Sequence, residues 1–403
     1  MLLFDHLQQE QPSLSQHALS LLHDLGLGIS KQGINKRFNT KAVAFVKSLL
    51  EEYLKGKLPY ESIPTEWTEC FKSIRIMDAT QFHLPENLKE SYPGYGGCGT
   101  ISCAQIQFEY DIISGNIIEL TLDSATVADV TYANKSLASV NKGELFLRDL
   151  AYNGLWTLNE IDLRGGYFIS KIKEHVVLYE EKNGKLVKLD NKEILSRIKK
   201  NKCDSIELNV LVGKEQKMPV RLIATVLEDE AIKRREQRKK FRHKTLSEND
   251  KARCSLNLII TNIPVQMIPM EGIYPIYQLR WQIEIVFKVW KSILNIQKIR
   301  RMKTERFECY IYSKLIWILI SRDIVRQSEL KIMSKSKHQL SEYKCFAIIK
   351  RYAYEVKEFF LRSSDKLKEW IEKIEYYFSK YGNKEKRKNH ANSYDLLKIK
   401  SNQ

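Results

Sequence analysis

The sequence contains little glycine and proline, the residues that most often interrupt regular structure. Its 403 residues include 17 glycines and 9 prolines, about half of average usage, so most of the chain is expected to lie in helices and strands. The seven cysteines are scattered, and only Cys98 and Cys103 lie close together, at a spacing that is unusual for zinc. Reduced thiols in a cytosolic protein are therefore expected.

Long apolar runs and a secretion signal are also missing. The longest apolar run covers residues 315–320, far short of the roughly 20 residues that cross a bilayer. The N-terminus lacks a basic segment followed by an apolar stretch. We therefore expect a cytoplasmic protein with no membrane partner, and at about 150 residues per domain its length favours two or three domains.

Basic residues outnumber acidic residues, and the excess positive charge is unevenly distributed along the chain. The 66 lysines and arginines against 49 aspartates and glutamates give a net charge of +17, which favours a polyanionic partner. Residues 1–70 are almost neutral, so the remaining chain carries the surplus. Residues 233–244 hold eight cations and one glutamate, and they are interpreted either as a phosphate-tracking helix or as a solvated one.

The first 70 residues show helical spacing of apolar positions, with breaks at 26–30 and 59–64. No acid lies between Leu25 and Leu50, whereas five basic residues do. Ser30 is predicted to cap the second of two short helices. The pattern fits a DNA-binding helix-turn-helix and equally a plain helical cap on the core.

Later segments show strand periodicity and then helical periodicity again. Residues 104–112 alternate strictly between apolar and polar, which predicts a half-buried strand, and residues 118–122 form its hairpin partner. A helix over 127–140 and a short strand over 144–149 follow, an order that predicts an α/β fold with mixed strand pairing. Residues 165–262 favour strands, with a turn at 182–185, and the chain is almost entirely helical from Gly272 onward.

Asp78 and Asp149 each continue the apolar face of a predicted strand and then end it. A carboxylate at such a position is costly unless something pairs with it. The plain alternative is an aspartate that makes a turn or caps the next helix.

A third acid lies in the segment 277–291, together with a tyrosine and three basic side chains. If this segment is one helix, the five positions fall within an arc of about 80°. These positions are Tyr277, Arg280, Glu284, Lys288 and Lys291. The alternative is a solvated face held by ion pairs between residues four apart, but such a face does not require a tyrosine in register.

These motifs resemble those of bacterial cut-and-paste DDE transposases of the insertion-sequence-4 type. The family signature is Tyr, two residues, Arg, three residues, Glu, six residues and Lys. Relatives also place their two aspartates in strands that read like residues 76–80 and 147–152. The match spans roughly residues 71–300. The positions that fit the signature are Tyr277, Arg280, Glu284 and Lys291.

The resemblance implies an α/β fold with an RNase H-like mixed-sheet catalytic core, a β-rich insertion, and helical N- and C-terminal regions. It implies that Asp78, Asp149 and Glu284 are catalytic and hold two Mg²⁺ or Mn²⁺ ions per active site. Three clustered carboxylates repel one another unless cations lie between them. Oxygen ligands without histidine or cysteine suit these metals.

The implied domain organisation divides the chain into five segments. Residues 1–70 form a helical region, read as a candidate helix-turn-helix, and residues 71–164 begin the catalytic core. Residues 165–262 form the β-rich insertion with its basic helix, and residues 263–330 complete the core with the glutamate-bearing helix. Residues 331–403 form a helical region, expected to support dimerisation, and end in a basic tail.

The resemblance also implies DNA-binding roles. In the family, the Tyr, Arg and Lys of the signature hold phosphates near the element's end, a role carried here to Tyr277, Arg280 and Lys291, with Lys288 added because it shares their face. The basic helix of the insertion is expected to lie close to DNA. Its cations are Lys233, Arg234, Arg235, Arg238, Lys239 and Lys240.

Relatives use an aromatic residue of the insertion to hold a base flipped out of the DNA end. Here no tryptophan lies between Trp156 and Trp281, so hairpin formation on the cleaved end is left open. The other aromatic side chains considered for this contact are Tyr167, Phe168, Tyr179 and Phe241.

The predicted function is transposition. The protein is expected to bind the inverted-repeat ends of a mobile element, cleave them by two-metal catalysis and join the 3′ ends to target DNA. Its predicted partners are duplex DNA and a second copy of the chain, in a bacterial cytoplasm and at the nucleoid when bound to DNA. The alternatives are a DNA-binding protein with an inactive RNase H-like core and a nuclease without strand transfer.

Overall fold

The chain forms two compact units, each assembled from segments that are distant in sequence. A computed structural model describes residues 12–55, 70–96, 100–242, 245–336, 339–362 and 364–385. Unit 1 comprises Met1–Thr65, Ala79–Val127 and Trp281–Gln403, and unit 2 comprises Glu66–Asp78 and Ala128–Arg280. Strand β1 (Ser73–His83) contributes to both units.

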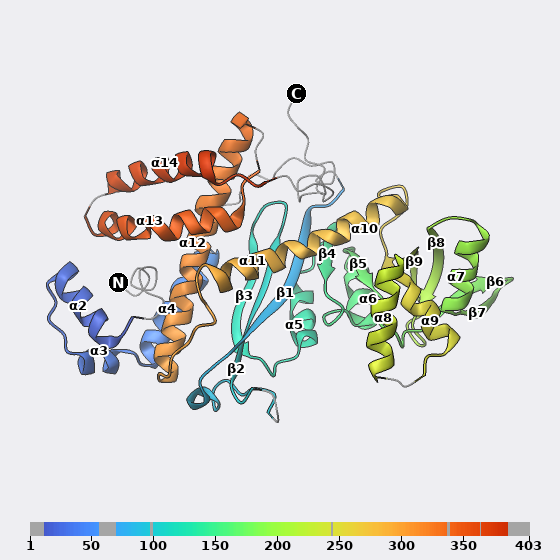
Figure 1. Ribbon diagram of the computed structural model, residues 1–403, viewed down its shortest axis with the longest axis horizontal. Coiled ribbons are helices and arrows are strands. Elements are labelled where there is room, and N and C mark those ends of the chain that lie inside the picture. Colours follow the sequence, from blue (N-terminus) through green and yellow to red (C-terminus); the bar gives the residue numbers. More distant parts are fainter. Residues whose placement is uncertain are drawn as a thin grey trace. The chain divides into compact units, whose positions relative to one another are not determined.

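The N-terminal helices of unit 1 are α2 (Leu14–Leu25), α3 (Lys31–Arg37) and α4 (Thr40–Lys55) (Figure 1). The predicted cap is confirmed, because the Ser30 hydroxyl accepts a hydrogen bond from the Gly33 amide at 3.1 Å. Buried His17 shares a hydrogen bond of 2.8 Å with Tyr310 of α12 (Thr304–Ser336). These helices are therefore anchored to the C-terminal part of unit 1.

The hairpin of unit 1 pairs β2 (Cys103–Asp111) with β3 (Ile117–Ser124), as predicted. The expectation of a half-buried strand is wrong, because every residue of β2 is buried. Its apolar face packs on α11 (Gln282–Ser292) through Phe108 and Trp290, whose ring centroids lie 5.0 Å apart. Its polar face is enclosed as well, and there Gln81 donates a hydrogen bond of 2.7 Å to Gln105.

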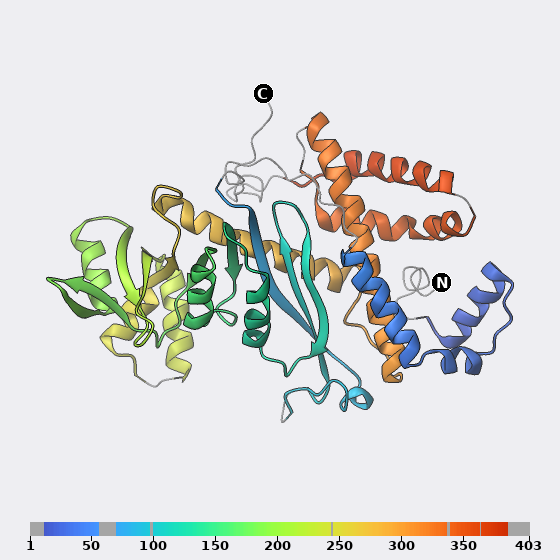
Figure 2. The same ribbon diagram turned by 180° about the vertical axis from the view of Figure 1, so that it is seen from behind.

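The C-terminal helices of unit 1 are α12, α13 (Glu342–Arg362) and α14 (Ser364–Tyr381), and the predicted helical pattern is confirmed over these described residues. Helices α13 and α14 form an antiparallel pair against α12, visible from both sides (Figures 1 and 2). A search of the described ranges finds no helix with the length and apolar character of a membrane span.

Unit 2 contains a mixed sheet in the order β1-β4-β5-β10-β9-β8-β6-β7. The first three strands are parallel and the others antiparallel. The predicted turn at 182–185 is confirmed, because Asn183 and Gly184 adopt the left-handed conformation that a tight hairpin needs. The strands are β4 (Glu144–Arg148), β5 (Tyr167–Lys171), β6 (Leu178–Lys182), β7 (Lys185–Leu189), β8 (Ser205–Val212), β9 (Met218–Val226) and β10 (Leu256–Thr261).

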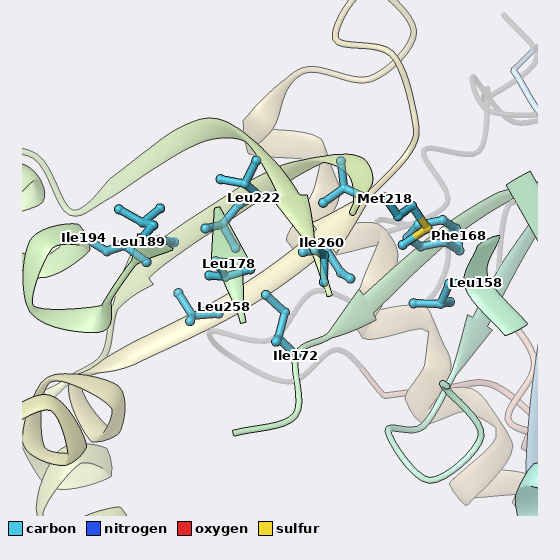
Figure 3. Close-up of a cluster of buried hydrophobic side chains, with 14 of the residues drawn as sticks. Leu158, Phe168, Ile172, Leu178, Leu189, Ile194, Met218, Leu222, Leu258 and Ile260 are labelled. Carbon is cyan, nitrogen blue, oxygen red and sulfur yellow. The ribbon is translucent and has the colours of Figure 1, made fainter. Parts of the chain in front are cut away.

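A continuous apolar cluster joins the parallel and antiparallel parts of this sheet (Figure 3). Phe146 and Leu158 belong to the same cluster as Phe168, Leu222 and Leu258. The strand-rich segment thus shares its core with the strand and helix that precede it. The helices of unit 2 are α5 (Asp129–Ser136), α6 (Leu155–Leu163), α7 (Asn191–Lys200), α8 (Asp229–Arg242), α9 (Glu248–Ser255) and α10 (Met270–Gln278).

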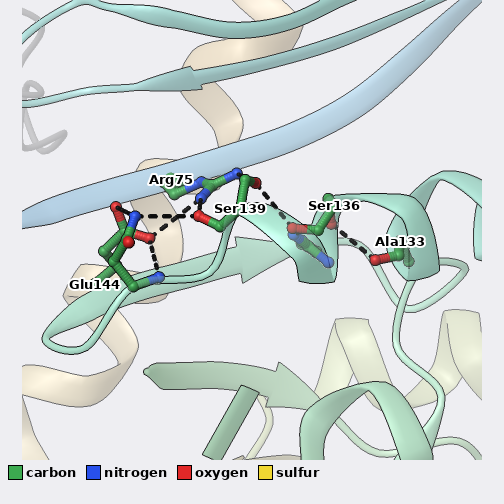
Figure 4. A network of polar contacts seen from close by, with 7 residues as sticks. Arg75, Ala133, Ser136, Ser139 and Glu144 are labelled. Atoms are coloured by element: carbon green, nitrogen blue, oxygen red, sulfur yellow. Dashed lines mark hydrogen bonds and ion pairs between the residues drawn. The ribbon is translucent and has the colours of Figure 1, made fainter. Parts of the chain in front are cut away.

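Buried Arg75 joins β1 to the start of β4 (Figure 4), and buried Arg148 joins β4 to α5. Arg75 of β1 donates to the Ser139 carbonyl at 2.7 Å and pairs with Glu144 at 3.1 Å. Arg148 of β4 donates to the Ser136 hydroxyl at 2.7 Å, and both guanidiniums stack on the ring of Phe146. The Arg75 pair supports the alignment of β1 with β4, and the predicted mixed α/β fold with flanking helices is confirmed.

Candidate active site

Three charged side chains occupy neighbouring positions on adjacent strands of unit 2, where the parallel pairing of β1, β4 and β5 ends. Met77 pairs with Arg148, which places Asp78 beside Asp149 one residue further along. Leu147 pairs with Ile169, so that Lys171 lies on the other side of Asp149. Neighbouring strands are about 4.8 Å apart, so Asp78, Asp149 and Lys171 form a short row, here called the carboxyl-edge row.

The two aspartates lie on the face that the sequence predicted. Ile76 and Leu147 form a register pair and are fully buried, and Asp78 and Asp149 continue this face by one alternation. Asp149 also makes a turn, because its carbonyl accepts a hydrogen bond from the Tyr152 amide at 3.0 Å. Asp149 directly follows the end of β4, but the expectation that Asp78 ends its strand is wrong, because β1 continues to His83. Both carboxylates lie on the sheet face where the apolar row stops.

The segment that carries the Tyr-Arg-Glu-Lys signature is not one continuous α-helix. Helix α10 ends at Gln278, a 3-10 turn η3 (Leu279–Trp281) follows, and α11 begins at Gln282. The single helix assumed for the expected arc is therefore not present, because a 3-10 turn winds at about 3 residues per turn rather than 3.6 and changes the phase of the positions after it.

Tyr277 and Arg280 are buried in unit 2, so the alternative of a solvated face is wrong for this part of the segment. Arg280 Nη1 lies 3.5 Å from Asp78 Oδ2. The Lys171 ammonium lies 5.6 Å from the centre of the Tyr277 ring. Burial raises the pKa of Tyr277 to about 12, so its phenol keeps its proton at neutral pH and remains a hydrogen-bond donor.

The remaining signature residues lie on α11 in unit 1. Lys288 is exposed, and Glu284 and Lys291 are half-buried. Lys291 Nζ donates to the Gln81 carbonyl at 3.2 Å, and burial lowers the pKa of Lys291. Helix α11 is held in place by Phe287 and Trp290, which both pack on the hairpin strand β2.

The carboxyl-edge row has the donor chemistry of a site for a hard divalent ion. Its carboxylate oxygens suit Mg²⁺ or Mn²⁺, and the Arg280 guanidinium already supplies positive charge beside Asp78. In the ranges that the structure describes, no cluster of three or more histidine, cysteine, aspartate or glutamate side chains is close enough to hold a metal. The aspartates belong to unit 2 and Glu284 to unit 1, so their sharing of metal ions is a proposal.

The cations of α8 divide between two faces of the helix. Arg235 donates to the Leu256 carbonyl at 2.9 Å, and Lys239 pairs with Asp250 at 2.7 Å and Glu174 at 3.3 Å. These two side chains have partners within the protein. The cations of α8 that are exposed are Lys233, Arg234, Arg238 and Lys240.

The sequence profile described as "Transposase DDE domain" matches residues 69–320 of the chain. The chain belongs to the DDE transposase family. It is therefore a metal-dependent enzyme that acts on DNA, and the predicted resemblance to bacterial insertion-sequence transposases is confirmed.

Curated transposases match this DDE transposase over most of its length. The transposase for insertion sequence element IS231E of Bacillus thuringiensis subsp. finitimus is 33% identical over 399 residues, covering 94% of this chain and 83% of that protein. The IS231F transposase of B. thuringiensis subsp. israelensis is 35% identical over 355 residues, covering 83% and 74%. The IS1151 transposase of Clostridium perfringens is 29% identical over 391 residues, covering 92% and 82%.

The four aromatic side chains considered for holding a flipped base in this transposase differ in how exposed they are. Phe168 is buried in the core cluster, and Tyr167 packs edge-on against Phe71. Tyr179 is half-buried. Phe241, at the end of the basic helix α8, is 95% exposed, which favours it among the four for a contact with DNA.

Sequence reasoning missed Lys171. It belongs to none of the family motifs, and its own strand, residues 167–171, carries no special pattern. Only the register of β5 against β4 places it beside Asp149.

Proposed function

We propose that the protein is a cut-and-paste transposase that binds the inverted-repeat ends of its element, cleaves them and joins the 3′ ends to target DNA. The observation that carries this proposal is the alignment of Asp78 with Asp149 at the edge of parallel strands, with Arg280 beside Asp78. The relatives, which are transposases for insertion sequence elements, support the same function.

Asp78, Asp149 and Glu284 would hold two Mg²⁺ or Mn²⁺ ions. Such ions activate an attacking water or 3′-hydroxyl and stabilise the departing oxygen. Tyr277 offers a neutral phenol that can donate a hydrogen bond to a phosphate oxygen, and Arg280 offers a planar cation that suits the same group. The nearly complete burial of both side chains limits their motion, which favours a fixed phosphate position.

DNA is proposed to contact both units. Lys288 and Lys291 of α11 would bind phosphates near Glu284, and the exposed face of α8 would follow the backbone with Phe241 available to stack on a base. The helices of residues 1–70 are proposed to take part in recognising the repeats. Residues 331–403 are proposed to support a homodimer, because the two ends of an element must be brought together.

Substitution of the acids tests the catalytic assignment. Asp78→Asn, Asp149→Asn and Glu284→Gln are each expected to abolish cleavage, because each removes a negative ligand, while DNA binding is retained. The assay is cleavage in Mg²⁺ of a supercoiled plasmid that carries the inverted repeats flanking the gene. Glu215→Gln, at an exposed turn between β8 and β9, is the control and should cleave at the wild-type rate.

The products distinguish the alternative functions. Cleavage followed by joined products supports transposition, whereas cleavage without joining indicates a nuclease. Binding without any cleavage by the wild-type protein indicates a DNA-binding protein with an inactive core. Substantial cutting by any of the three acid variants would contradict the catalytic assignment.

A further inference from the structure

Lys171 is a cation that strand register places at one end of the carboxyl-edge row. It is the last residue of β5, and the pairing of Leu147 with Ile169 puts it level with Asp149. Its side chain is on the same sheet face as the carboxylate, because side chains of a strand alternate between faces with a period of two. The ammonium is therefore on the face toward which both aspartates project.

The backbone of Lys171 is held from both sides. Strand β5 lies between β4 and β10, and Lys171 itself pairs with Ile259 of β10. The next residue, Ile172, is buried, and its carbonyl accepts a hydrogen bond from Arg253 at 2.9 Å. The position of the side chain is fixed further by the Tyr277 ring, 5.6 Å from the ammonium.

Three arginines and Asp149 lie near Lys171. The ammonium is half-buried, and its pKa is lowered first by burial and then by nearby Arg235 and Arg280, whereas Asp149 raises it. Arg253 is a further cation close to it. Cations gathered in a partly desolvated place repel one another unless an anion joins them. This arrangement suits a phosphate group.

We propose that Lys171 is a further catalytic residue, whose ammonium binds a non-bridging oxygen of the phosphate that the enzyme cleaves. The inference rests on the proposed function and adds a residue to it. In that reaction the oxygen of water bonds to phosphorus while the bond from phosphorus to the 3′ oxygen breaks. One proton of the water passes to solvent and the 3′ oxygen takes one up, leaving a 3′-hydroxyl and a 5′-phosphate. Lys171 stabilises the charge on the phosphoryl oxygens throughout.

Removing the charge alone tests this role. Lys171→Met keeps an apolar stem against the Tyr277 ring, and it is expected to slow cleavage by about 100-fold, the effect of losing one donor to a reacting oxygen. Lys171→Arg should recover part of the rate, since it restores the cation. Lys188→Met, on exposed strand β7 of the same unit, is the control and should cleave like wild type.

A second measurement separates phosphate contact from a structural role. Binding is measured in Ca²⁺ to a duplex that carries the flanking inverted repeat, with either a normal phosphate or a neutral methylphosphonate at the cleavage position. Wild type should bind the methylphosphonate duplex more weakly than the normal duplex. Lys171→Met should reduce this difference, because one of the positive charges that contact the phosphate is gone.

Two outcomes would overturn the inference while leaving the proposed function intact. One is cleavage by Lys171→Met at the wild-type rate. The other is a binding difference between the normal and methylphosphonate duplexes that is as large in this variant as in wild type. If the variant is less stable in thermal unfolding, the methylphosphonate comparison still decides, because it compares two duplexes on one protein. Failure of the wild-type protein to cleave at all would instead count against the proposed function.

Discussion

At the scale of single residues, Arg75 shows how a buried contact between β1 and β4 holds the strands that carry the candidate site. It lies on β1 with its side chain almost fully buried, and it joins β1 to Glu144 at the start of β4. The alignment of these two strands places Asp78 beside Asp149. The buried ion pair therefore holds the alignment on which the carboxyl-edge row depends.

Arg75→Met is expected to lower the free energy of unfolding by about 3–5 kcal/mol, because it leaves the Glu144 carboxylate, whose side chain is only 13% exposed, without its cation. Urea denaturation followed by tryptophan fluorescence measures the loss. Arg164→Met is the control, since Arg164 pairs with Glu160 on the outer surface of α6 and should change stability by less than about 1 kcal/mol. Equal losses of unfolding free energy in the two variants would show that burial does not increase the contribution of the Arg75–Glu144 pair to stability.

At the scale of elements, the basic side chains on the two faces of helix α8 have different roles. One face supplies partners to Asp250, Glu174 and a backbone carbonyl, and the other face is open to solvent. The family resemblance implied a DNA-binding role for six of its cations, with a solvated helix as the alternative. The structure leaves that role, as a proposal, to the exposed ones.

Adjacent lysines of α8 make a matched pair for testing this division. Lys240→Ala is expected to weaken DNA binding and to reduce the slope of log affinity against log salt by about 1, because one phosphate contact is lost, with unchanged thermal stability. Lys239→Ala should lower the melting temperature, since Asp250 and Glu174 lose their partner, and should leave the slope nearly unchanged. Fluorescence anisotropy over a salt series measures the slope, and thermal unfolding measures the stability. A reduced slope in Lys239→Ala with a lowered melting temperature in Lys240→Ala would contradict the assignment of the two faces.

At the scale of the whole molecule, the proposed metal ligands are contributed by both units. Asp78 and Asp149 come from unit 2, and Glu284 comes from unit 1. A ligand that binds only the folded protein raises its stability. Shared metal ions would therefore stabilise the chain only when all three acids are present.

Mn²⁺ is accordingly expected to raise the melting temperature of the wild-type protein, and chelation by EDTA should reverse the increase. Asp149→Asn and Glu284→Gln should each remove most of this shift, although they lie in different units. Differential scanning fluorimetry with and without Mn²⁺ provides the measurement, with Glu215→Gln as the control. A full shift in Glu284→Gln would show that the glutamate does not share the metal.

Local patterns were enough to predict much of this protein from its sequence. The hairpin, the Ser30 cap, the turn at 182–185 and the strand that ends just before Asp149 all follow from periodicity and turn chemistry, which act between residues close in the chain. The family was also recognisable, because its signature lies in short segments whose spacing is visible in the sequence.

Other features were decided only by the tertiary structure, because they depend on which distant segments meet. Alternation in β2 could not reveal that its polar face is also covered, and helical periodicity could not reveal the 3-10 turn before Gln282. Lys171 belongs to the carboxyl-edge row only through the register of β5 against β4. Strand register is set by packing across the whole sheet, and a sequence pattern of period two does not specify which neighbour a strand will have.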